Sequence, residues 1–134
     1  MKRTISILFL IILLTSIVGC KKDDVKMQYF SIVSESISIR ATTITITVNY
    51  SYPSTLKTVN GYISQSSSMN NALNATCEIN KNSFVIRFNN LQANTKYYYY
   101  YDYSNGIDNI IRSEIHSLTT NEYGLPTVIT NEVI

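Results

Sequence analysis

The chain lacks the residues on which most catalytic and metal sites depend. Its 134 residues include no tryptophan, two cysteines and one histidine, and His116 has no second histidine with which to share a zinc ion. The sequence contains no glycine-rich phosphate loop and no Gly-x-Ser-x-Gly turn that would carry a nucleophilic serine. We therefore expect no enzyme activity, no cofactor and no metal ion.

An excess of charge of one sign is also lacking. The chain has 11 basic and nine acidic residues, and two of the basic ones, Lys2 and Arg3, lie at the N-terminus. Without residues 1–19 the chain is formally neutral and carries no basic cluster beyond Lys21-Lys22, so nucleic acid is excluded as an expected partner. The apolar segment from Ile5 to Val18 has 14 residues, which is too short to span a bilayer comfortably.

The N-terminal segment instead predicts an export signal. The positively charged Lys2 and Arg3 precede the apolar segment, which is followed by Gly19 and Cys20 in the order Ile17-Val18-Gly19-Cys20. A small residue before a cysteine resembles the bacterial lipobox, and this resemblance implies that residues 1–19 are a lipoprotein signal peptide and that Cys20 is the lipid attachment point. The alternative is an ordinary secretory signal with a chance cysteine. If Cys20 is acylated, Cys77 is the single free thiol, and no intramolecular disulfide is expected.

Residues 20–27 are expected to form a lipidated tether. The lysine-then-acidic order after Cys20 resembles the sorting signal of surface-exposed lipoproteins in the Bacteroidetes, which implies an outer-membrane location, exposed at the cell surface. A charged, solvated spacer without sorting content is the alternative. The membrane, through the lipid anchor, is the first expected partner. The candidate sorting residues are Lys21, Lys22, Asp23 and Asp24.

The folded part is predicted to be all-β. Proline and glycine are scarce, whereas Ile, Thr, Val and Tyr are abundant, a composition that favours strands. Residues 42–50 alternate strictly between apolar and polar side chains, as a half-buried strand does. About seven short strands separated by turn signals are expected, with a polar loop at 65–74. The clearest strand segments are 29–39, 42–50, 56–64, 84–88, 97–104 and 110–118.

One motif suggests a particular sandwich. Leu91, Thr95 and Tyr97 are spaced as in the tyrosine corner of fibronectin type III domains, and the strands on both sides extend the resemblance over residues 28–120. It implies a seven-stranded antiparallel immunoglobulin-like sandwich in which Leu91 plugs the core and the Tyr97 hydroxyl bonds the backbone. Tyr101 departs from the family, which usually has a small residue there, so we expect either a wider core or a ring tilted outwards.

Five consecutive tyrosines supply the candidate binding site. Strand alternation places Tyr98 and Tyr100 on the outer face, about 7 Å apart, where they would suit a sugar or a protein partner. The alternative is a half-buried face protected by aromatic cross-strand pairing. Asp102 and Asp108 flank the turn after this strand and are expected to be solvated acids rather than calcium ligands.

The expected function follows from the predicted cellular location and the predicted fold. We expect a non-catalytic, lipid-anchored binding or spacer module at the cell surface. The alternative is a glycan-binding accessory lipoprotein of a polysaccharide-uptake system, so a glycan or another surface protein is the second expected partner. Residues 121–134 resemble the linker and first strand of another repeat. Because a lone strand cannot bury its apolar face, we expect a mobile tail or, as an alternative, a strand donated to a neighbouring subunit.

Overall fold

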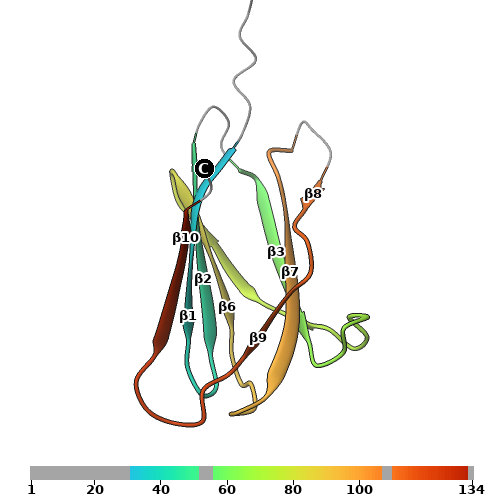
Figure 1. Ribbon diagram of the computed structural model, residues 1–134. Helices are drawn as coiled ribbons and strands as arrows, with labels where there is room; N and C mark the ends of the chain where they lie inside the picture. The colour runs from blue at the N-terminus through green and yellow to red at the C-terminus, as the bar shows by residue number, and fades with distance from the viewer. Residues whose placement is uncertain (1–30, 52–55, 107–109, 133–134) are drawn as a thin grey trace, which may run out of the picture.

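The computed structural model describes residues 31–51, 56–106 and 110–132. These residues form strands and no helix, so none of them belongs to a helix long and apolar enough to cross a membrane. The strands lie in two antiparallel sheets that face each other (Figure 1). The all-β prediction is confirmed, with ten strands in the described residues rather than about seven.

The first sheet has the strand order β10-β1-β2-β6-β5. Its long central strands alternate between buried and more exposed positions, as their sequences predict. The bounds are Ser31–Ile39 for β1, Ile44–Ser51 for β2, Thr76–Ile79 for β5, Ser83–Phe88 for β6 and Thr127–Glu132 for β10.

The second sheet has the order β4-β3-β7-β8, and β9 also pairs with β7. The segment predicted as one final strand is divided, because Ser113 leaves the ladder and bonds Tyr101 through its own side chain and backbone. The bounds are Thr58–Ser64 for β3, Leu73–Asn74 for β4, Lys96–Ser104 for β7, Ile111–Arg112 for β8 and His116–Thr119 for β9.

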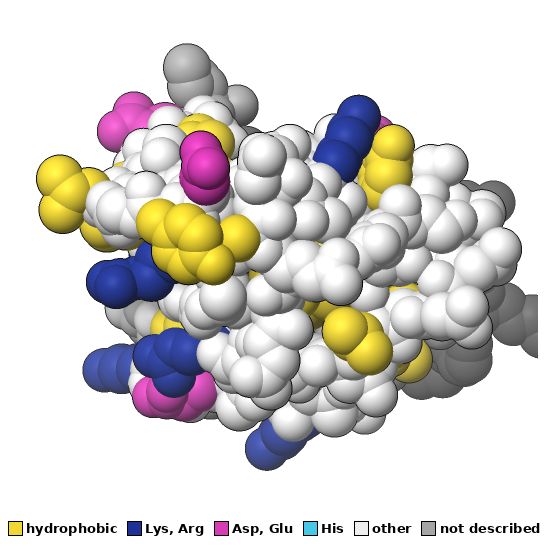
Figure 2. Space-filling model, turned by 90° about the horizontal axis from the view of Figure 1, so that it is seen from below, with side chains coloured by type: hydrophobic (Ala, Val, Ile, Leu, Met, Phe, Trp, Pro, Cys, Tyr) yellow, Lys and Arg dark blue, Asp and Glu magenta, His cyan; other side chains and the backbone are white. Residues whose placement is uncertain are grey.

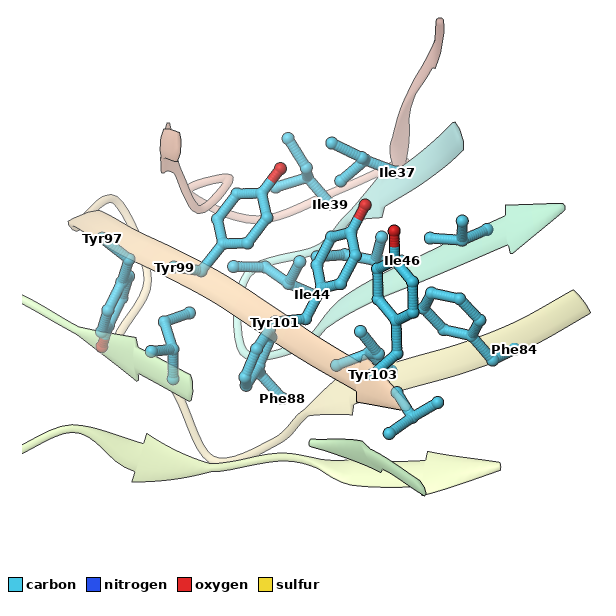
Figure 3. Close-up of a cluster of buried hydrophobic side chains, with 14 of the residues drawn as sticks. Ile37, Ile39, Ile44, Ile46, Phe84, Phe88, Tyr97, Tyr99, Tyr101 and Tyr103 are labelled. Carbon is cyan, nitrogen blue, oxygen red and sulfur yellow. The ribbon is translucent and has the colours of Figure 1, made fainter. Parts of the chain in front are cut away.

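The core lies between the sheets and is rich in aromatic rings. Ile46 of β2 is fully buried and stands in register between Ile37 of β1 and Ile86 of β6. Four tyrosines of β7 enter the core from the opposite sheet. Tyr99, Tyr101 and Tyr103 lie side by side with their hydroxyls pointing the same way, whereas the Tyr97 ring points to the other side of the strand end (Figure 3). Tyr99, Tyr101 and Tyr103 therefore supply the inner face of β7, and Tyr97 is buried at the end of the strand.

Tyr101 stays inside the core and does not tilt out. Its side chain is 5% exposed, and its ring meets Phe84 edge-on with 5.6 Å between centroids. Its hydroxyl donates a hydrogen bond to Oε2 of Glu35, a buried carboxylate on β1, at 2.9 Å. Burial, and then the nearby Glu35 carboxylate, raise the pKa of Tyr101 well above its usual value. The large ring is accommodated because its polar end has a buried partner.

The C-terminal segment is a strand of this sheet rather than a mobile tail. β10 pairs antiparallel with β1 over six register positions, from Ser34 opposite Glu132 to Ile39 opposite Thr127. Asn121 holds the segment before β10 against the end of β1, since its Nδ2 donates a hydrogen bond to the Ile39 carbonyl at 3.0 Å. The expectation of a mobile tail is therefore wrong for residues 127–132. Backbone pairing along the free edge of β1 holds the strand even though every β10 residue is exposed.

Candidate functional site

The predicted anchor lies outside the described residues. This applies to the lipid attachment point and to the sorting signal, and also to Asp108 beside the turn after β7. Their roles remain predictions from the sequence. The anchor and sorting residues concerned are Cys20, Lys21, Lys22, Asp23 and Asp24.

The outward side of the second sheet carries an aromatic surface, which we call the tyrosine face and define by Tyr62, Tyr98, Tyr100 and Arg112. Tyr62 of β3 stands opposite Tyr100 of β7 in register, and their rings stack with centroids 4.8 Å apart and an interplanar angle of 26°. The guanidinium carbon of Arg112 lies 4.6 Å from the centroid of Tyr100. Tyr100 is thus held by a stacking partner from β3 and by a cation–π contact from β8.

A buried acid holds the arginine in this position. Asp102 is 4% exposed, and its Oδ2 accepts a hydrogen bond from Nη2 of Arg112 at 3.2 Å. Its other oxygen accepts from Nδ2 of Asn60 at 3.0 Å. The expectation of a solvated acid is therefore wrong for Asp102, because cross-strand register gives it a partner on each side. A charge-assisted pair of this kind orients the guanidinium over the ring.

Tyr98 has a different environment from Tyr100. Its register neighbours are two small residues, Ser64 on β3 and Ser117 on β9, and no aromatic ring stacks on it within the described residues. Its recorded ring contact there is with Lys96, whose Nζ lies 5.3 Å from the centroid. The two predicted platform residues therefore differ in their contacts: Tyr100 stacks on Tyr62 of the neighbouring strand, whereas Tyr98 is half-buried between two serines with the Lys96 ammonium over its ring.

The connection between β6 and β7 contains the residues of the suggested corner. Leu91 is 4% exposed, and its N–H donates to the Thr42 carbonyl at 3.0 Å. The Thr95 hydroxyl donates to the Ala93 carbonyl at 2.8 Å and so tightens the turn. The Tyr97 hydroxyl accepts a hydrogen bond from the backbone N–H of Gln92 at 2.9 Å. The leucine is thus buried while the tyrosine ties β7 to the preceding turn.

The single histidine and the described cysteine occupy structural positions. His116 stacks on the buried Tyr99 ring with 5.4 Å between centroids. Cys77 is half-buried on β5, and burial raises the pKa of its thiol, which disfavours the reactive thiolate. Among the described residues, no group of three His, Cys, Asp or Glu side chains could hold a metal ion.

Sequence reasoning missed Tyr62, Asn60 and Arg112 as members of this surface. Each has the right side-chain type, but only the pairing of β3 and β8 with β7 brings them to Tyr100 and Asp102. The period-2 pattern of Asn60, Tyr62 and Ser64 was the available signal, since it places all three on one face.

No family model, curated protein or solved structure matches this chain.

Proposed function

We propose that the protein is a non-catalytic binding or spacer module, anchored to the outer membrane through a lipid on Cys20 and exposed at the cell surface. The observation that carries the binding role is the tyrosine face. Its Tyr62–Tyr100 stack and the Asp102–Arg112 pair hold an aromatic and cationic surface in a fixed geometry on the outside of a sheet. Preorganised aromatic and arginine side chains are the groups that dominate binding surfaces.

The architecture supports a fibronectin type III-like module. One sheet contains β1, β2 and β6 and the other contains β3, β7 and β8, which is how an immunoglobulin-like sandwich distributes its strands. The bond from Gln92 N–H to the Tyr97 hydroxyl lies where a tyrosine corner would place it. β10 adds a strand beyond this pattern, next to β1.

The anchor is tested first, because it fixes where the module acts. A single acyl chain gives marginal membrane binding, whereas two or more, at about 0.8 kcal/mol per buried methylene, hold a protein stably. Cys20→Ala should therefore abolish incorporation of a palmitate analogue and block normal cleavage of the signal peptide. Cys77→Ala is the matched control and should still be labelled. Labelling of the Cys20→Ala protein would reject the anchor, and resistance to protease added to intact cells would reject surface exposure.

A glycan-binding role is the second candidate, and it is favoured because no aromatic ring of the described residues stacks on Tyr98. Small serines flank Tyr98 on both sides, so a sugar ring could stack on the Tyr98 face in the place that the flexible Lys96 side chain occupies. Affinity electrophoresis in gels containing neutral polysaccharides tests this role. We expect retardation of the wild-type chain, loss of retardation in Tyr98→Ala, and retention in the control Tyr123→Ala, whose exposed tyrosine lies outside the tyrosine face. Unaltered mobility of the wild type in every gel would reject it.

A further inference from the structure

A cavity of about 480 Å³ lies where β3 ends, beside the loop that precedes β4. This loop projects to the right of β7 in the lower half of Figure 1. The volume lies within the range of roughly 300 to 1,000 Å³ that is typical of small-molecule sites. The cavity is lined by Ile63, Ser64, Gln65, Ser66, Asn70, Asn71, Leu73 and Tyr97.

The loop that forms the cavity wall is fixed by its own hydrogen bonds. The Ser64 hydroxyl donates to the Asn70 carbonyl at 2.6 Å and accepts from the Ser66 N–H at 3.0 Å. The Met69 N–H donates to the Ser66 carbonyl at 2.9 Å. Asn71 has a positive φ of 53°, which turns the chain back towards β4. The cavity is therefore preformed, and a ligand would not need to order the loop.

Tyr97 presents an unused proton to this cavity. Its side chain is 4% exposed, and its hydroxyl accepts from the Gln92 N–H at 2.9 Å and from Nε2 of Gln65 at 3.4 Å. A phenol has two acceptor lone pairs and one donor hydrogen. The Gln92 bond occupies one lone pair, the longer Gln65 contact approaches the other, and no hydrogen bond donated by this hydroxyl is found within the described residues. A buried donor facing a cavity is suited to an acceptor oxygen from a ligand.

The chemistry of the lining defines the ligand class. None of the lining residues is charged, so neither phosphate, carboxylate nor a cation would find a counter-charge there. The side chains of Gln65, Asn70 and Asn71 offer amide donors and acceptors, and Leu73 with the Tyr97 ring offers apolar surface. The face of the molecule seen in Figure 2 shows separate groups of hydrophobic side chains, with no continuous apolar patch. Paired hydroxyl and C–H surfaces are characteristic of a neutral sugar.

From this lining, we propose that the cavity binds a neutral saccharide unit, one of whose hydroxyl or ring oxygens accepts the proton of Tyr97. Ser64 belongs to the cavity wall and also stands opposite Tyr98 in register, so the cavity adjoins the tyrosine face. A glycan chain bound in the cavity would continue over the Tyr98 ring. The inference rests on the glycan-binding alternative and adds a site that anchors one sugar unit.

Nuclear magnetic resonance titration of the full chain tests the site, with neutral oligosaccharides of glucose, mannose, galactose and xylose as probes and a sulfated oligosaccharide as the charged comparison. We expect one neutral probe to shift the Gln92 backbone amide and the side-chain amides of Asn70 and Asn71. Equal shifts by the sulfated probe would overturn the neutral-ligand assignment. The absence of shifts with every neutral probe would overturn the site itself.

Two variants with matched controls complete the test. Tyr97→Phe should weaken binding about threefold to tenfold, the effect of one neutral hydrogen bond, whereas Tyr123→Phe should not. Asn71→Gly keeps the positive φ and removes an amide, and it should also weaken binding. Asn90→Gly is its control, since Asn90 has a φ of 58° and lies outside the cavity lining. If Tyr97→Phe does not fold, the comparison of Asn71→Gly with Asn90→Gly decides whether the cavity binds the sugar. Loss of binding in Tyr98→Ala with full binding in both cavity variants would reject the cavity and retain the glycan function.

Discussion

Gly61→Ala should be among the most damaging single substitutions in this protein. Gly61 lies in β3, and its carbonyl accepts a hydrogen bond at 2.9 Å from the N–H of Ala75, the residue between β4 and β5. A Cβ placed there would stand 2.5 Å from Cγ2 of Ile86 and 2.9 Å from Cβ of Ala75. Real Cβ atoms essentially never come so close, and Ile86 is fully buried, so it has no free space into which to move.

The expected cost follows from overpacking. One extra methylene in a well-packed core costs roughly 1 to 3 kcal/mol, and contacts on two sides place this case at the upper end, about 3 kcal/mol. Such a loss would be a large fraction of the roughly 5 to 15 kcal/mol that stabilises a typical domain. Urea unfolding at equilibrium should show a lower midpoint with an unchanged slope.

A second substitution identifies the contact responsible. Ile86→Leu removes the Cγ2 branch that meets the new methyl group, so the double variant should be more stable than the sum of the two single effects predicts. A free energy of unfolding for Gly61→Ala within about 0.5 kcal/mol of the wild-type value would show that the sheets separate easily here and would refute the close-packing argument. Strict additivity in the double variant would show that Ile86 is not the obstacle.

Three further predictions concern the corner, the buried tyrosines and the last strand. Leu91→Ala should cost about 2 to 5 kcal/mol in urea unfolding as a core truncation, and an unchanged midpoint would contradict its role as a core plug. Burial and the Glu35 carboxylate raise the folded-state pKa values of Tyr99 and Tyr101 above 10.0, so stability should be complete below about pH 10 and fall as pH rises further, because the unfolded chain releases phenolic protons that the folded chain keeps. Unfolding curves between about pH 8 and 12 measure this fall; Tyr101→Phe should make it shallower, and a stability that rises over this range would refute the assignment. Deleting residues 127–134 should expose the edge of β1 and increase self-association in analytical ultracentrifugation, with a small loss of stability because the β10 side chains are exposed; an unchanged association state would show that the edge needs no cover.

Short-range patterns in the sequence were sufficient to predict the long strands. The alternation of residues 42–50 places Ile44, Ile46 and Val48 on one face, and all three are fully buried. The same period separates the odd from the even tyrosines of β7. These features depend on neighbours along one strand, and the geometry of an extended chain fixes which side chains share a face.

Short or weakly patterned strands could not be read in this way. β5 has four residues and β8 has two, too few for a period to be recognised. β10 forms because β1 offers an unpaired edge some 90 residues earlier in the chain, a condition that its own sequence does not contain. The interruption between β8 and β9 likewise depends on the bonds of Ser113 to Tyr101.

The sequence by itself determined the all-β class, the outward direction of Tyr98 and Tyr100 and the inward direction of Leu91, since each follows from local alternation or a local turn. Only the tertiary structure decided that Tyr100 is stacked, that Tyr98 is not, and that Asp102 is buried beneath Arg112. The reason is register. A slip of one residue between β3 and β7 would turn Tyr62 to the other face, and the interactions that fix this register come from residues distant along the chain.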